Sequence, residues 1–206
     1  MTISLARANK LIEELRDREI FYGRDPATWC FYENHVYGTA KIAKMIASEI
    51  KNMDPNKVFF MGLLHDISRT EENRLQRFHG ILGYEVLINE DKDAARSSLL
   101  HMFPWNKLPP YSECKKSFFN IKKDYDFIDD FIKNNPATDE DYLIQLCDNL
   151  ANKNGFVTLE ERAKEYIIRH GNVSVDDILI HGKELKDYFE SKIGHDIYDF
   201  FNMTNN

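Results

Sequence analysis

The sequence predicts an all-α fold, because signals for the start of a helix recur along the chain and no segment shows the pattern of a β-strand. Two Asp-Pro pairs, Asp25-Pro26 and Asp54-Pro55, place a capping carboxylate before a proline at the first helical position. Three capping boxes follow later in the chain, and they begin at Thr138, Thr158 and Ser174. Between these signals no apolar and polar residues alternate over a sustained stretch, which argues against β-strands.

Length and composition indicate one soluble domain. The 206 residues suit a single core with appended helices, and 43% hydrophobic and 30% charged residues are typical of globular proteins. The longest apolar run, Val58 to Leu64, is far shorter than the roughly 20 residues that span a bilayer. The N-terminus has no basic segment followed by a long apolar one, so we expect no secretory signal, no membrane association and a cytoplasmic location.

Cysteine usage and net charge exclude further classes of protein. Cys30, Cys114 and Cys147 are widely spaced, which argues against a disulfide framework and against a thiolate zinc site. We interpret them as reduced thiols of the core or the surface. The net charge of −7 provides no broad basic field for a long nucleic acid, although a local site could still be positive.

The first half of the chain predicts helices that carry histidines on their apolar faces. Residues 4 to about 20 form an amphipathic helix, and the helix that starts at Asp25-Pro26 places His35 in line with Ile42 and Ile46. The helix after Asp54-Pro55 ends at the pair His65-Asp66. Since adjacent helical residues lie about 100° apart, both side chains reach one ion only near a helix end or with the ion wedged beside the helix.

The middle of the chain adds two more histidines. His79 begins a helical line of apolar residues, and His101 lies in the last turn of a helix capped by Asp91 or Asp93. Residues 104 to 120 hold three of the six prolines and form the longest irregular stretch, either a lid or recognition loop or a plain surface connection.

The last third of the chain is expected to be helical as well. A short helix spans Tyr125 to Phe131, and the helix that starts at Thr138 carries Asp148 on its apolar face before Gly155 closes it. The other two capping boxes start helices that end at Gly171 and near Gly194. A second His-Asp pair, His195-Asp196, follows in a charged tail, and we interpret it as solvated surface.

Six polar residues share an unusual position on an apolar helical face or at its end. Any one of them would ordinarily be a hydrogen-bonded core residue, but six such coincidences favour a metal site. Nitrogen and carboxylate ligands without thiolate suit iron, manganese, zinc, cobalt or nickel. The six are His35, His65, Asp66, His79, His101 and Asp148.

On these motifs the sequence resembles the HD-domain superfamily of all-helical, metal-dependent phosphohydrolases. The resemblance rests on Asn34-His35, on Gly62-Leu63-Leu64-His65-Asp66-Ile67 and on Leu146-Cys147-Asp148-Asn149-Leu150, and it covers roughly residues 30 to 152. The additional His79 and His101 are similar to those of the branch that binds two metal ions. The resemblance implies a single-domain HD-type bundle with an N-terminal helix (1–24), a catalytic core (25–155) and packed C-terminal helices (156–206).

The resemblance also implies a role for each residue. The residues His35, His65, Asp66 and Asp148 would hold one divalent ion, and Asp66 would bridge to a second ion held by His79 and His101. The reaction would be water attack on a phosphate ester or anhydride, with Asp66 and His65 at the catalytic centre.

Two further residues are candidates for binding beside the metal ligands. Arg69 could bind a phosphate, or it could be a solvated linker residue; Asn149 could hydrogen-bond near the ligands, or it could be a plain helix residue. Lys107 and Tyr111 have weaker support as contacts of a leaving group. The expected partner is a small phosphorylated substrate such as a nucleotide, and a homodimer is left open. Ser68-Arg69-Thr70 departs from the Lys often found there in dinucleotide-cleaving relatives, so the resemblance does not name the substrate.

Two other functions share the same ligand set. A di-iron oxygenase with this fold would use the six ligands for O₂ chemistry on a small polar substrate, and ligand identity alone does not separate the two reactions. A regulator that binds a nucleotide without turnover is the third alternative. The complete ligand set speaks against it, because a pure binder gains little from retaining every residue that activates water.

Overall fold

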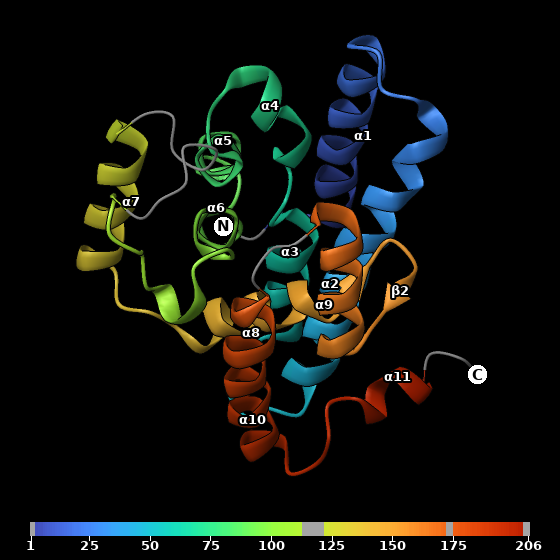
Figure 1. Ribbon diagram of the computed structural model, residues 1–206, viewed down its shortest axis with the longest axis vertical. Coiled ribbons are helices and arrows are strands. Elements are labelled where there is room, and N and C mark those ends of the chain that lie inside the picture. The colour runs from blue at the N-terminus through green and yellow to red at the C-terminus, as the bar shows by residue number, and fades with distance from the viewer. Residues whose placement is uncertain (1–2, 113–121, 172–174, 204–206) are drawn as a thin grey trace.

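The computed structural model describes residues 3–112, 122–171 and 175–203. Within these ranges the chain is helical except for one short hairpin, so the predicted all-α fold is confirmed. Figure 1 shows α7 and α11 on opposite sides of the molecule, with α2, α3 and α8 between them. No helix among the described residues is both long enough and apolar enough to cross a bilayer.

The N-terminal half contains the helices that carry the predicted histidines. Their bounds are α1 Leu5–Phe21, η1 Pro26–Thr28, α2 Trp29–Ser48, α3 Pro55–Leu64, η2 Arg69–Glu71, α4 Glu72–Leu75, α5 His79–Leu87, α6 Lys92–Leu100 and η3 Pro104–Asn106. The η elements are short turns of tighter or wider helix. The expected helices at 4–20, after Asp25-Pro26 and after Asp54-Pro55 are all present.

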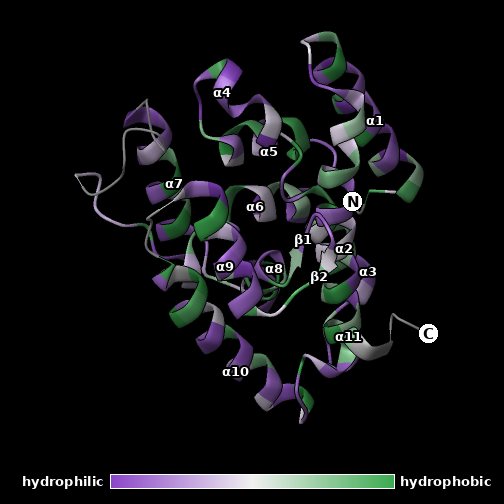
Figure 2. Cartoon of the chain, turned by 45° about the vertical axis from the view of Figure 1, so that its right-hand side comes forward, coloured by the Kyte–Doolittle hydropathy of each residue, from purple (hydrophilic) through white to green (hydrophobic). Residues whose placement is uncertain are grey.

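The C-terminal half closes the bundle. Its elements are α7 Lys122–Asn134, α8 Asp139–Asn149, β1 Ala151–Asn152, β2 Gly155–Phe156, α9 Leu159–His170, η4 Asp177–His181, α10 Gly182–Ile193 and α11 Asp199–Met203. The two strands pair antiparallel. In Figure 2 hydrophilic and hydrophobic residues alternate along α1 and α10, as expected for helices with one face in solvent.

The predicted caps form where the structure describes them. The Asp54 side chain accepts hydrogen bonds from two backbone N–H groups of α3, and both capping boxes, at Thr138 and Thr158, are complete. The alternative between Asp91 and Asp93 resolves to Asp91, whose carboxylate caps α6. The cap at Ser174 lies outside the described residues, and so does Cys114.

Three features were not expected from the sequence. Helix α7 is longer than Tyr125 to Phe131, since ion pairs such as Lys122–Asp126, four residues apart, extend it beyond its aromatic centre. The hairpin forms because the Asn152 side chain accepts from the backbone of Asn154, and Gly155 adopts a φ of +111°. Residues 104–106, placed in an irregular stretch, form a helical turn.

Helices α2 and α3 form the centre of the molecule. At Gly62 a Cβ would lie 2.9 Å from the Cα of Ala40, so only glycine permits this close packing of the two helices. The apolar residues of α1 share a core with α2 and α3, while Leu185 and Phe189 of α10 share another core with α8. The division of the chain at residues 24 and 155 stays a prediction.

Candidate metal centre

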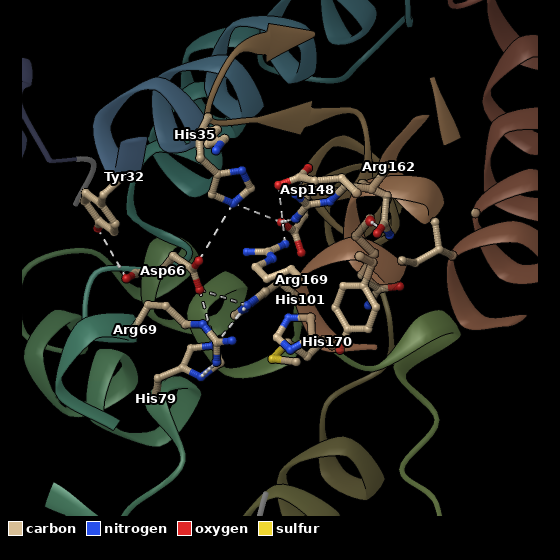
Figure 3. A pocket seen from close by; sticks show the side chains of 18 of the residues that line it. Tyr32, His35, Asp66, Arg69, His79, His101, Asp148, Arg162, Arg169 and His170 are labelled. Carbon is tan, nitrogen blue, oxygen red and sulfur yellow. Dashed lines mark hydrogen bonds and ion pairs between the residues drawn. The ribbon is translucent and has the colours of Figure 1, made fainter. Parts of the chain in front are cut away.

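The fold brings the six predicted ligands together from five helices. His35 comes from the second turn of α2, and the pair His65-Asp66 follows the last residue of α3. His79 opens α5, His101 caps the C-terminus of α6, and Asp148 lies near the end of α8. Figure 3 shows Asp66 with four of the other side chains, those of His35, His79, His101 and Asp148, gathered around it.

One half of the cluster consists of His35, His65 and Asp148. The Oδ1 atom of Asp148 lies 3.1 Å from Nε2 of His35 and 3.5 Å from Nε2 of His65. The Oδ2 atom of Asp66 lies 3.8 Å from each of the same two nitrogens. This half could hold one metal ion, because its donor atoms converge on one point.

The other half consists of His79 and His101 beside the second oxygen of Asp66. The Oδ1 atom of Asp66 lies 3.2 Å from Nε2 of His79 and 3.3 Å from Nε2 of His101, and these two nitrogens are 3.3 Å apart. Asp66 therefore presents one carboxylate oxygen to each pair of histidines. The two halves are not fully separate, since His65, Asp66 and His101 also have donor atoms that lie close enough to share one ion.

The outer nitrogen of each imidazole has a hydrogen-bond partner that leaves the inner nitrogen for the cluster. Nδ1 of His35, His65 and His101 faces the carbonyl oxygen of Ala151, Gly62 and Ser98, at 3.1, 2.7 and 2.9 Å respectively. A carbonyl accepts only, so each Nδ1 donates and each Nε2 is left with a lone pair in the neutral ring. Such partners orient histidines that bind metals.

His79 has a different partner from the other three histidines. Its Nδ1 lies 3.2 Å from Oε2 of Glu72 and 3.1 Å from the guanidinium of Arg69, which itself pairs with Glu72 at 2.6 Å. Arg69 can only donate and Glu72 can only accept, so the two contacts favour opposite tautomers of His79. A metal ion at Nε2 would require the tautomer in which Nδ1 donates to Glu72. Nothing in the sequence marked Glu72, because it lies in a charged linker.

This arrangement gathers acceptors that repel one another unless a cation lies among them. In the neutral tautomers in which Nδ1 donates, Nε2 of His79, Nε2 of His101 and Oδ1 of Asp66 are three acceptors within 3.3 Å. Nε2 of His65 is buried and has no hydrogen-bond partner among the described residues. The donor set of imidazole nitrogens and carboxylate oxygens fits divalent iron, manganese, cobalt, nickel or zinc.

The pKa shifts within the cluster also favour a positive charge among its acceptors. Burial lowers the pKa of His65, but the carboxylates of Asp66 and Asp148 outweigh burial and raise the pKa to about 9. Burial raises the pKa of Asp66 and of Asp148, and the surrounding histidines more than offset it, so both pKa values lie well below the usual range. The cluster stabilises positive charge, supplied by a proton or by a metal ion.

A cavity of about 770 Å³ opens in front of the cluster. Arg69, predicted to bind a phosphate, and Asn149, predicted to hydrogen-bond near the ligands, both line it; the Asn149 side chain donates to the carbonyl of Gln145. Lys107 and Tyr111 do not line the cavity, and Tyr111 packs against Tyr125 instead. His195 of the second His-Asp pair lies elsewhere on the surface, 2.7 Å from Glu49.

The opposite wall of the cavity comes from the C-terminal helices, which sequence reasoning did not connect with the site. Around the whole cavity, the cationic side chains outnumber the carboxylates outside the metal cluster. The cavity is therefore locally positive, although the chain carries a net charge of −7. The cationic residues are Arg24, Arg69, Lys153, Arg162 and Arg169, against Glu165. Spacing along α9 could have shown that Arg162 and Arg169 share a helical face, but not that this face turns toward the metal ligands.

Comparison with known families supports this interpretation of the cluster. A family model described as the HD domain matches residues 32–153, more than half of the chain. The matched segment begins three residues before His35 and ends five residues after Asp148, so it contains all six candidate ligands. No curated protein and no solved structure shows a significant match to the chain. The chain therefore belongs to the HD-domain superfamily of metal-dependent phosphohydrolases.

Proposed function

We propose that this protein is a phosphohydrolase that uses divalent metal ions to cleave a phosphate ester or anhydride, in a nucleotide or a related small phosphorylated metabolite. The observation that carries the proposal is the position of Asp66, which presents one carboxylate oxygen to His35 and His65 and the other to His79 and His101. A carboxylate in this position can contact two ions at once, which is the arrangement used in two-metal hydrolysis.

The ligands divide between two ions in this proposal. His35, His65 and Asp148 would hold the first ion, His79 and His101 would hold the second, and Asp66 would contact both. Bound divalent ions would lower the pKa of a water molecule and stabilise negative charge on the phosphoryl oxygens. The geometry of the free cluster supports this division, because each half contains two Nε2 atoms that face one oxygen of Asp66.

The protein itself would orient the substrate and fix the ligands. Carbonyl oxygens and Glu72 hold the imidazole rings, so that the lone pairs converge without rearrangement. Arg69 lines the cavity beside His79 and can donate two parallel hydrogen bonds to a phosphate. The excess of cationic side chains favours an anionic substrate over a neutral one.

The test is release of inorganic phosphate from a panel of nucleotides, phosphate anhydrides and simple phosphomonoesters. The protein is reconstituted with Mn²⁺, Co²⁺ or Fe²⁺ and compared with the variant Asp66→Ala. The matched control is Asp196→Ala, because Asp196 belongs to the other His-Asp pair and its side chain is 53% exposed.

We expect phosphate release from at least one compound, loss of that release in Asp66→Ala and full release in Asp196→Ala. Equal release by Asp66→Ala and the parent protein would contradict the role of Asp66. Absence of release across the panel, together with O₂ consumption by protein loaded with iron, would contradict hydrolysis and favour the oxygenase.

A further inference from the structure

Helix α9 packs Leu159 and Ala163 into the protein, turns a polar face toward the cavity and leaves two isoleucines on the outside. Positions 162, 165, 166, 169 and 170 follow the spacing of one helical face, and all five line the cavity. On the outside of the helix, Ile167 is 44% exposed and Ile168 is 85% exposed. A helix of a soluble protein normally places its apolar residues inside. The polar face of α9 is therefore placed where it can contact a ligand in the cavity.

Glu165 holds two arginines of this face in place. Its carboxylate lies 3.3 Å from Nη1 of Arg162 and 3.7 Å from Nη2 of Arg169, and it accepts a hydrogen bond of 3.0 Å from Asn152. The two guanidinium groups leave the helix two turns apart and converge on one carboxylate. One carboxylate satisfies only a few of their ten N–H donors, so the pair keeps a net positive charge and donors free for an anion.

Arg162 lies beside the candidate metal ligands, whereas the Arg169 side chain is 50% exposed and lines the same cavity. Nη2 of Arg162 is 4.0 Å from Oδ1 of Asp148, and the Arg162 side chain is only 14% exposed. Figure 3 shows Arg162, Arg169 and His170 pointing into the cavity toward the histidine cluster. His170 lines the same cavity, and partial desolvation together with the charges of Arg169 and Arg69 lowers its pKa.

The charges of the site exceed what one phosphate group requires. Two divalent ions on Asp66 and Asp148 leave two positive charges, which already match the dianion of a single phosphoryl group. The pair Arg162 and Arg169, with Glu165, adds one more positive charge at the same edge of the cluster. A second phosphate next to the reacting one would match that charge and use the free donors.

From this arrangement we infer that the inward face of α9 is a subsite for a second phosphate group, so that the substrate is a phosphate anhydride with at least two adjacent phosphates. The inference rests on the proposed function, because it assumes that the first phosphate lies at the metal ligands. Arg162 contacts the reacting phosphate or its neighbour, and Arg169 contacts the neighbour. The cavity, about 770 Å³, leaves room for an organic group beyond the phosphates.

The experiment measures binding of two probes, inorganic phosphate and imidodiphosphate, to the metal-loaded protein by titration calorimetry. Imidodiphosphate carries two adjacent phosphates and resists hydrolysis. We expect the parent protein to bind imidodiphosphate at least about tenfold more tightly than phosphate, since each new contact to a charged group is worth 1.5–3 kcal/mol. We expect Arg169→Gln to remove most of that preference and Arg169→Lys to retain part of it.

The control is Arg16→Gln, because Arg16 lies on α1 and its side chain is 40% exposed. Arg16→Gln should bind both probes as the parent protein does. If Arg169→Gln and Arg162→Gln both bind imidodiphosphate as tightly as the parent protein, the subsite is refuted. Metal content measured on the same samples shows whether a loss of binding comes from loss of the ions instead.

Failure of the subsite and failure of the proposed function give different results. If imidodiphosphate binding depends on Arg169 but no substrate releases phosphate, the subsite stands and the hydrolase proposal fails. If phosphomonoesters are cleaved as well as anhydrides, and equally by Arg169→Gln and the parent protein, the hydrolase proposal stands and the subsite fails.

Discussion

Glu72→Gln should weaken binding of the second metal ion and leave the first unchanged. Oε2 of Glu72 lies 3.2 Å from Nδ1 of His79, and it is the carboxylate that would direct the lone pair of His79 toward Asp66. The amide of Gln has nearly the same shape, but it lacks the charge and can also present its NH₂ group to the ring. Removing a partner of this kind ordinarily costs about 10- to 100-fold in metal affinity, or about 1.4–2.7 kcal/mol.

The first ion serves as an internal reference in the same titration. Its expected ligands His35 and His65 are oriented by backbone carbonyls that Glu72 does not touch. A competition titration with Zn²⁺ against a chelator should therefore show two steps in the parent protein. Only the step that belongs to the ion at His79 and His101 should shift in Glu72→Gln.

The matched control is Glu85→Gln, which makes the same substitution on α5, the helix that His79 opens. Glu85 pairs with Arg77 and its side chain is 55% exposed, so both steps should remain unchanged. Two unchanged steps in Glu72→Gln would refute the assignment of Glu72 as the partner that orients His79. A shift of both steps together would refute the division of the ligands between two ions.

Three further results are expected. Arg96→Met should lower the free energy of unfolding by about 3–5 kcal/mol in urea titrations, because it leaves the fully buried carboxylate of Asp141 without its bidentate partner. Gly62→Ala should cost about 1–3 kcal/mol in the same measurement, since its Cβ would meet the backbone of Ala40 at 2.9 Å. Metal binding near pH 7.5 should release a proton from His65, whose pKa of about 9 keeps the metal-free ring protonated. Calorimetry in buffers of different ionisation enthalpy measures this release.

The ligands could be predicted from the sequence because each of them interrupts an apolar pattern. His35, His79 and Asp148 fall on helical faces that are otherwise buried, and helical spacing alone indicates that they point into the core. The ends of the helices at His65-Asp66 and His101 could be predicted as well, since the caps and Pro104 mark them. Local rules were therefore sufficient for most of the helices and for choosing six residues that the fold brings together; that these residues bind metal stays a prediction.

The rest of the site depends on tertiary contacts that the sequence pattern does not reveal. Glu72 lies in a linker with the composition of any charged loop, and only the fold brings it to His79. Arg162 and Arg169 lie outside the segment that matches the HD domain, on a helix whose spacing shows a charged face but not its orientation. The expected contacts of Lys107 and Tyr111 remain without support, because these residues do not line the cavity that the C-terminal helices complete.

The most direct test of the two-ion centre is the number of metal equivalents per chain. Protein loaded with Mn²⁺ or Co²⁺, freed of excess metal and measured by mass spectrometry of the elements, should contain two equivalents in the parent protein and one in His101→Ala. His195→Ala, at the surface pair with Glu49, should retain two. One equivalent in the parent protein, or two in His101→Ala, would contradict the account that Asp66 joins two metal ions.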